Sequence, residues 1–336
     1  FIYSGALEQG FTPASVILDA PVVIEGESLE ESWRPENDSG RFYGPTRLRD
    51  ALARSRNLVS IRILRAIGVD FAQQYAMRFG FEREQLPANL TLALGTASVT
   101  PLQMAGGYAV FANGGFRVTP YLVDRVEGAD GAVLYVAEPK LACLDCPPQI
   151  PPPRAEPSPA PDAVVTADGT IATAPDVTGA TTPPEAAALA DDRQAAAAVL
   201  APERTPPPFT AGADEPGVTR LADVGGVEPL PRERVATQAI STANAWLTTD
   251  LVRDVIRRGT AQRANALRRS DLAGKTGTTN DSRDTWFAGF NADLVATAWV
   301  GFDQERSLGR GEEGGRTALP IWLYFMGEAL PGTPER

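Results

Sequence analysis

The amino-acid sequence predicts an α+β fold in which an antiparallel sheet is flanked by clusters of helices. Near the C-terminus, three short strand patterns at 272–279, 285–291 and 294–303 are joined by polar turns, which is typical of an antiparallel meander. Helical patterns precede and follow this meander instead of alternating with single strands. Helices segregated from an antiparallel sheet define the α+β class.

A proline-rich segment divides the chain. Between Pro147 and Pro231 the sequence places 18 of its 29 prolines, and Phe209 is the single aromatic residue there. Such a composition cannot bury enough apolar surface to offset the conformational entropy lost on folding, so we expect a disordered or loosely draped insert. The predicted organisation is a first part of the domain at 1–146, the insert at 147–231 and a second part at 232–336.

Three helical patterns occupy the first part. The stretch PTRLRDALARS is amphipathic and has Pro45 at its start, which favours a helix beginning there. The run from Leu58 to Ile67 is apolar on nearly all sides and ends at Gly68, so the second helix should be buried. In SVTPLQMAGGYAVFANGG, Thr100 is a helix cap and Gly114 begins the stop signal.

The remaining patterns complete the expected layout. A hairpin should turn at Asp130 and Gly131. After the insert, a helix begins at about Ser241 and ends at Gly259. The stretch LPIWLYFMGEAL, with Pro320 near its start, should form a last helix that closes the domain.

Composition excludes several functions. The net charge is −11 and no basic cluster is present, so nucleic acid is not an expected partner. The chain has no histidine, which removes Ser-His-Asp and Cys-His catalysis and His-ligated metals, and we expect neither a cofactor nor a metal. Cys143 and Cys146 are either a local disulfide clip or an incidental pair. The apolar runs fall far short of the roughly 20 residues that cross a bilayer.

One lysine is placed where chemistry is expected. The chain has two lysines, Lys140 and Lys275, among 31 basic side chains. Lys275 begins a Lys-Thr-Gly triplet on the first predicted strand of the meander, and Thr276 and Thr278 add hydroxyls beside it. A compact ammonium flanked by hydroxyls can hold a substrate carboxylate and lower the proton affinity of a nearby hydroxyl. The alternative is a solvated lysine on a strand, with Gly277 marking a simple bulge.

A second candidate is the segment Ser55-Arg56-Asn57. Residues two apart on a helix point in different directions, so Ser55 and Asn57 can act together only if they lie in a turn between two helices. The alternative is an ordinary helix cap. After the Lys-Thr-Gly strand, residues 280–284 are expected to be a turn in which Asp281 and Asp284 are solvated, with Trp286 and Phe287 in the core or the cleft wall.

Lys-Thr-Gly, together with Ser-x-x-Lys and a second serine motif, is typical of serine β-lactamases and penicillin-binding proteins. With Ser55-Arg56-Asn57 and Lys275-Thr276-Gly277-Thr278, this sequence strongly resembles the transpeptidase domain of the class A penicillin-binding proteins of Gram-negative bacteria. The resemblance implies their penicillin-binding and serine β-lactamase-like fold. It extends through the stretches FIYSGALEQGFTPAS, RSRNLVSIRILRAIG, LALGTASVTPLQMAGGYAVFANGG, AGKTGTTNDSRDTWFAGFNADLVATAWVGFD and ALPIWLYFM.

The sequence departs from this family in one motif. No serine stands three residues before a lysine, because Ala137 precedes Lys140 and Leu272 precedes Lys275 at that spacing. In the family, Ser-x-x-Lys stands immediately before the stretch that resembles FIYSGALE. We therefore expect a chain truncated just after this motif and inactive alone, cut from a parent with a glycosyltransferase domain and an inner-membrane anchor that acts in the periplasm.

The resemblance also implies roles for the candidate residues. The parent's missing serine would attack stem peptides ending in D-Ala-D-Ala, and β-lactams would acylate it. Ser55 would relay a proton, Asn57 would hold the substrate carbonyl and the missing lysine, and Lys275 would supply positive potential. Thr276, Gly277 and Thr278 would bind the substrate, and cell-wall synthesis proteins are conceivable partners.

Two other functions stay open. One is a D,D-carboxypeptidase or β-lactamase-type hydrolase with the same residues, and the other is a non-catalytic module that binds stem peptides.

Overall fold

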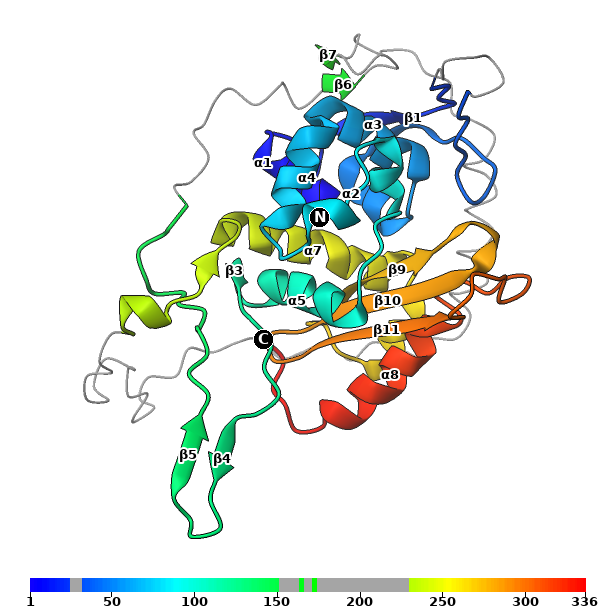
Figure 1. Ribbon diagram of the computed structural model, residues 1–336. Helices are drawn as coiled ribbons and strands as arrows, with labels where there is room; N and C mark the ends of the chain where they lie inside the picture. Colours follow the sequence, from blue (N-terminus) through cyan, green and yellow to red (C-terminus); the bar gives the residue numbers. More distant parts are fainter. Residues whose placement is uncertain (25–31, 151–162, 166–170, 174–229) are drawn as a thin grey trace, which may run out of the picture. The chain divides into compact units, whose positions relative to one another are not determined.

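The computed structural model describes residues 1–24, 32–150, 163–165, 171–173 and 230–336 (Figure 1). These residues belong to one compact unit, which contains Phe1–Thr173 and Leu230–Arg336. Most of the insert expected between 147 and 231 lies outside the described residues.

The antiparallel meander forms the centre of this unit. Its strands are β9 (Ala273–Thr278), β10 (Asp284–Phe290) and β11 (Val295–Gly301). They are ordered β11-β10-β9, and both pairs are antiparallel, which confirms the predicted meander. Among the described residues, the strand with the Lys-Thr-Gly triplet is therefore at the edge of this sheet.

Three helices cover the sheet. They are α5 (Pro101–Ala112), α7 (Thr242–Arg258) and α8 (Ala318–Ala329). Figure 1 shows α5 and α7 on one side of the sheet and α8 on the other. Phe287 of β10 packs edge-on against Trp322 of α8, with ring centroids 4.9 Å apart, and both side chains are fully buried. The predicted bounds of these helices are confirmed to within about two residues at each end, including the Thr100 cap of α5.

A second group of helices comes from the first part of the chain. Its members are α1 (Ile2–Glu8), α2 (Leu48–Ala53), α3 (Asn57–Ile67), α4 (Val69–Met77) and the short 3₁₀ turns η2 (Arg83–Gln85) and η3 (Leu90–Leu94). Helix α3 is buried as predicted, with Leu58, Val59 and Leu64 fully covered. It ends at Gly68, whose φ of 85° suits glycine. Helix α7 contacts α1 and α2 as well as β9, so it joins the two parts of the chain.

A small sheet borders this second group, and it corrects two expectations. It contains β1 (Val16–Asp19), β2 (Gly44–Arg47), β6 (Ala163–Val165) and β7 (Ile171–Thr173) in the order β2-β1-β6-β7. Pro45 does not start a helix. It belongs to β2 and pairs with Leu18 of β1, and α2 begins three residues later. Strands β6 and β7 lie in the segment that was expected to be loosely draped. The backbone of β6 pairs in parallel with β1, and β7 pairs antiparallel with β6.

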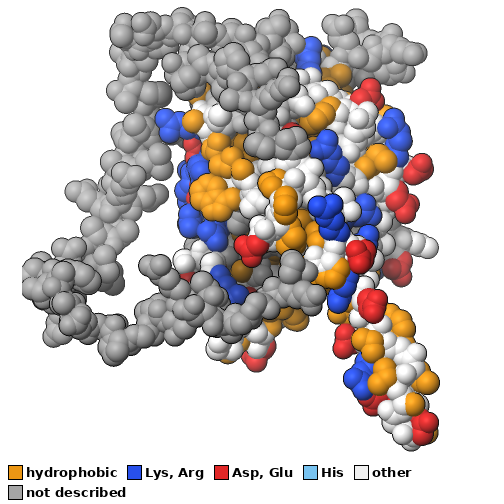
Figure 2. Space-filling model, turned by 90° about the vertical axis from the view of Figure 1, so that its left-hand side faces the viewer, with side chains coloured by type: hydrophobic (Ala, Val, Ile, Leu, Met, Phe, Trp, Pro, Cys, Tyr) orange, Lys and Arg blue, Asp and Glu red, His pale blue; other side chains and the backbone are white. Residues whose placement is uncertain are grey.

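The predicted hairpin is present as β4 (Arg125–Glu127) and β5 (Val133–Val136), joined through the turn at Asp130 and Gly131. Its strand residues are all exposed, and Figure 2 shows hydrophobic and charged side chains side by side on the protruding hairpin. Before the hairpin in the sequence, the short strand β3 (Phe116–Arg117) pairs antiparallel with β8 (Thr237–Gln238).

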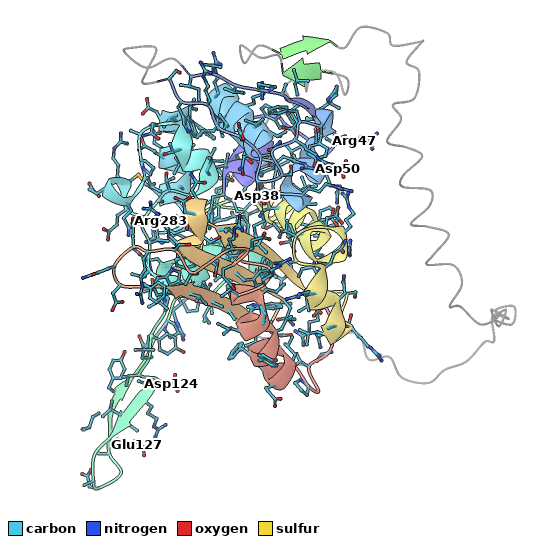
Figure 3. All side chains as sticks on the ribbon, turned by 90° about the vertical axis from the view of Figure 1, so that its right-hand side faces the viewer. Asp38, Arg47, Asp50, Asp124, Glu127 and Arg283 are labelled. Atoms are coloured by element: carbon cyan, nitrogen blue, oxygen red, sulfur yellow. A yellow bond between two sulfur atoms is a disulfide. The ribbon has the colours of Figure 1, made fainter. Side chains whose placement is uncertain are left out.

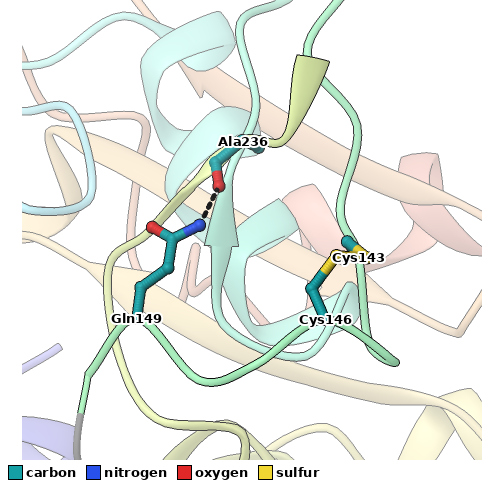
Figure 4. The surroundings of a disulfide bond; sticks show 4 residues. All are labelled: Cys143, Cys146, Gln149 and Ala236. Atoms are coloured by element: carbon teal, nitrogen blue, oxygen red, sulfur yellow. Dashed lines mark hydrogen bonds between the residues drawn. A yellow bond between two sulfur atoms is a disulfide. The ribbon is translucent and has the colours of Figure 1, made fainter. Parts of the chain in front are cut away.

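Cys143 and Cys146 are bonded, so the disulfide interpretation is confirmed. Beside them, the amide of Gln149 donates to the Ala236 carbonyl at 3.0 Å (Figure 4). The segment just after the disulfide is thereby fixed to the second part of the chain. In the described part of the chain, none of the helices is long and apolar enough to cross a membrane.

Candidate active site

The Ser55-Arg56-Asn57 segment forms the turn between α2 and α3. Helix α2 ends at Ala53, and Asn57 is the first residue of α3. Ser55 adopts a left-handed φ of 54°, a conformation that a non-glycine residue adopts only at some cost. Ser55 therefore lies in the turn between the two helices, as predicted, whereas Asn57 begins α3, and the Ser55 hydroxyl lies against Lys275 of the sheet.

Lys275 meets this turn from the edge strand. Its ammonium Nζ donates to Ser55 Oγ at 3.0 Å and to the Thr276 carbonyl at 2.9 Å. Ser55 and Lys275 are 220 residues apart in sequence, so the fold brings the two predicted motifs together. Burial lowers the pKa of the Lys275 ammonium to about 8, because desolvation disfavours the charged form. An ammonium here favours a negative charge on the Ser55 oxygen.

The two threonines after Lys275 each have a partner. Thr276 Oγ1 lies 2.7 Å from Thr260 Oγ1, and Thr278 Oγ1 accepts from the Gly314 backbone N–H at 3.0 Å. Gly277 lies between them, where a Cβ would come 3.1 Å from the Trp286 Cβ. The hydroxyls of Thr276 and Thr278 are thus both held at the edge strand, and that of Thr276 lies 3.4 Å from the Lys275 ammonium.

Asn57 is held by the segment that precedes β2. Its amide Nδ2 donates to the Glu36 carbonyl at 2.9 Å. The next residue, Asn37, is buried and donates to both oxygens of the buried Asp19 carboxylate at 2.9 and 3.0 Å. Asp19 and Asn37 therefore fix the segment on which the Asn57 side chain rests.

Sequence reasoning missed Thr260, Gly314, Asp19 and Asn37. The first two approach the edge strand from segments far away in the chain, so no local spacing relates them to Lys275. The one local feature that pointed to Thr260 is its position, because it directly follows Gly259 at the end of a helix.

Asp284 corrects an expectation. Its Oδ2 accepts from the indole N–H groups of Trp286 and Trp299, both at 3.0 Å. It is therefore a bonded residue at the start of β10 and not a solvated turn residue. Asp281 is exposed, as expected, and Phe287 is in the core. Across the described ranges, no group of three or more His, Cys, Asp or Glu side chains is placed to hold a metal.

An α+β domain whose edge strand carries Lys-Thr-Gly-Thr against a Ser-x-Asn turn defines the class of penicillin-binding transpeptidases and serine β-lactamases. The family model described as penicillin binding protein transpeptidase domain matches residues 1–151. Penicillin-binding protein 1A of Pseudomonas aeruginosa is 44% identical over 99% of this chain and 35% of the relative. Its counterpart from Neisseria lactamica is 36% identical over 100% of this chain and 31% of the relative. The chain belongs to the penicillin-binding protein transpeptidase family.

Solved structures agree with this assignment. Penicillin-binding protein 1A from Haemophilus influenzae is similar with a TM-score of 0.72 and 34% identity, over 100% of this chain and 42% of that chain. The penicillin-binding protein PonA1 from Mycobacterium tuberculosis, at 19% identity and a TM-score of 0.58, shares the fold. The chain spans about a third of the length of the curated relatives that it matches.

Proposed function

We propose that this chain belongs to a peptidoglycan D,D-transpeptidase, within a longer protein that also carries a glycosyltransferase domain. The contact of 3.0 Å between Lys275 Nζ and Ser55 Oγ carries the proposal. It assembles a proton relay without histidine, beside two threonine hydroxyls on an open strand edge. The share of the relatives that the chain covers supports a longer parent.

The reaction proposed is acyl transfer. A serine in a Ser-x-x-Lys motif, which precedes Phe1 in the parent, attacks the carbonyl between the two terminal D-alanines and passes its proton to the lysine of that motif. The C–N bond breaks, and terminal D-alanine leaves with a proton. An amine of a neighbouring stem peptide then attacks the acyl ester, loses a proton and forms the new amide, and the serine is released.

The residues of this chain position and stabilise these steps. Ser55 carries the proton to the leaving amine, and Lys275 stabilises negative charge on the Ser55 oxygen during that transfer. Asn57 binds the amide carbonyl of the substrate and the motif lysine. The hydroxyls of Thr276 and Thr278 bind the terminal carboxylate, and the Thr278 backbone N–H on the open edge donates to the oxyanion.

The same proposal covers ligands and location. Stem peptides ending in D-Ala-D-Ala are the substrates, β-lactams acylate the same serine, and other cell-wall synthesis proteins are candidate partners. The parent is anchored in the inner membrane of a Gram-negative bacterium and acts in the periplasm. The disulfide between Cys143 and Cys146 supports an oxidising compartment.

Product analysis on the parent protein tests the function. Incubated with stem-peptide substrate, it should form cross-linked dimers that require an acceptor amine. Release of D-alanine without dimers would establish a carboxypeptidase, and hydrolysed penicillin in place of a stable adduct would establish a β-lactamase. Reversible binding without any covalent adduct would establish a binding module. The chain 1–336 alone should take up no labelled penicillin covalently, because its sequence lacks Ser-x-x-Lys.

A further inference from the structure

The Thr276 hydroxyl has two neighbours that limit where its proton can point. Lys275 Nζ lies 3.4 Å from Thr276 Oγ1, and Thr260 Oγ1 lies 2.7 Å from it. A hydroxyl has one donor and two acceptor positions, whereas an ammonium can only donate. Lys275 therefore occupies one acceptor position, and the direction of the bond between the two threonines decides whether the Thr276 proton is free for a ligand.

Thr260 is fixed where it can act on Thr276. Its backbone N–H donates to the Ala53 carbonyl at 3.2 Å, at the end of α2 and two residues before Ser55. The preceding Gly259 lies so close that a Cβ would overlap the Ala53 carbonyl oxygen. From the other side, a Cβ on Gly315 would come 2.9 Å from the Thr260 carbonyl oxygen. The residue thus bridges the Ser-x-Asn turn and the edge strand.

We propose that Thr260 is a positioning residue of the carboxylate subsite, whose hydroxyl donates to Thr276 Oγ1 and so turns the Thr276 proton toward the substrate carboxylate. An anion selects this direction, because a hydrogen bond to a charged acceptor is stronger than one between neutral hydroxyls. Thr278 follows the same rule, since its oxygen accepts from the Gly314 N–H and its proton also remains for the ligand.

This inference rests on the proposed function, and it predicts an effect specific to the carboxylate. In the parent protein, Thr260→Val keeps the shape of the side chain and removes the hydroxyl. Acylation by a penicillin with a free carboxylate should slow about threefold to tenfold, the range for one neutral hydrogen bond. Acylation by the methyl ester of that penicillin should change less than about twofold, because the ester accepts no charge-assisted bond. Thr260→Ser should retain the wild-type rate.

Two further variants separate the possible failures. Thr276→Val should slow acylation by the free acid selectively. Thr12→Val is the matched control, because it removes one hydroxyl of a Thr12–Ser15 pair at 3.3 Å and should leave both rates and the melting temperature near wild type.

Each contrary result has one meaning. If Thr276→Val slows acylation and Thr260→Val does not, the inference is wrong and the proposed function stands. If Thr260→Val slows the acid and the ester equally, or lowers the melting temperature in proportion, Thr260 supports the fold and the inference is also wrong. If neither threonine matters, the carboxylate subsite itself is wrongly assigned. If the parent forms no adduct with either penicillin, the proposed acyl-transfer function is wrong and the inference that rests on it falls with it.

Discussion

Lys275 connects the two motifs, so its charge should matter more for the acylation rate than the charge of Lys140, the other lysine of the chain. In the parent protein, Lys275→Ala should lower the rate of acylation by penicillin at least about tenfold, because it removes a charge aimed at the reacting centre. Lys140→Ala is the matched control, since Lys140 is the other lysine and is exposed. Rates are measured by rapid mixing with a fluorescent penicillin. Equal rates for Lys275→Ala and wild type would remove Lys275 from the mechanism.

The same residue predicts a pH dependence. Burial lowers the pKa of Lys275 to about 8, so its charge is present below pH 8 and is lost as the pH rises through that value. Acylation should therefore fall on the alkaline side with a midpoint near 8. Lys275→Arg keeps a charge throughout this range, so its slower reaction should lack that limb. A limb that persists unchanged in Lys275→Arg belongs to another group.

The sequence predicts the residues of the two motifs, but it does not predict the residues that hold them in place. The Lys-Thr-Gly and Ser-x-Asn motifs are local patterns, and the structure places Lys275 against Ser55. Thr260 contacts Thr276 across 16 residues, and Gly314 contacts Thr278 across 36. Such contacts depend on how loops fold over the sheet. Asp284 accepts from two indoles, and one of them, Trp299, is on the neighbouring strand, where no local spacing relates it to Asp284.

At the level of secondary-structure elements, the loop before α8 packs against the edge strand β9 through Gly314. Gly314 donates to Thr278, and a Cβ on it would come 2.5 Å from the Gly277 carbonyl oxygen and 2.6 Å from that of Trp286. Gly314→Ala should therefore push the loop off the edge strand, costing about 1–3 kcal/mol in the free energy of unfolding and slowing acylation.

Gly106→Ala provides the control for this variant. Gly106 lies inside α5 with nothing within 4 Å of an added Cβ, so alanine should be neutral or slightly stabilising there. Urea unfolding of both variants gives the comparison. A Gly314→Ala protein as stable and as reactive as Gly106→Ala would show that the loop does not constrain the strand.

Elements with strong local signals could be predicted from the sequence. The reciprocal Thr100 and Gln103 cap, for example, starts α5 where expected. The start of α2 could not be predicted, because Pro45 suits a first helical turn and an edge strand equally well. The neighbouring strand β1 decides the matter by pairing with it.

Across the whole molecule, charged side chains join α2 to α7. Arg49 of α2 donates to Asp250 at 2.6 Å and to Asp254 at 3.0 Å, and Arg258 bonds both Asp254 and Asp50. Figure 3 labels Asp50, which lies on the helices of the first part. Asp254, with little exposed surface, is shared by residues from both parts of the chain.

This network predicts how stability depends on pH. Burial raises the pKa of Asp254, but hydrogen bonds from Arg49 and Arg258 outweigh it and hold the pKa below the ordinary value of 3.8. The ionised Asp254 carboxylate therefore stabilises the folded state fully at neutral pH, and this stabilisation is lost as the pH falls through the lowered pKa. Asp254→Asn should cost about 1–3 kcal/mol at pH 7 and flatten the acid decline in melting temperature. An unchanged acid decline would assign it to other carboxylates.

The insert marks how far composition could predict the organisation of the molecule. Composition predicts a disordered or loosely draped insert from 147 onward, yet the backbone N–H of Gln149 donates to the Gln238 side chain and the backbone N–H of Gln238 donates to the Gln149 side chain, both at 2.9 Å. Composition averages over many residues, so it cannot place the boundary to within a few of them.

If the ordered part of the chain extends beyond residue 147, deleting 174–229 and replacing Gln149 should affect stability differently. Deleting 174–229 should leave the melting temperature within a few degrees, because that composition contributes little apolar burial. Gln149→Ala should cost about 1–3 kcal/mol, because it leaves the backbone groups of Gln238 and Ala236 without their partner. Thermal unfolding of both proteins decides. A deletion that costs more than Gln149→Ala would show that 174–229 contributes to the fold and that the domain extends through it.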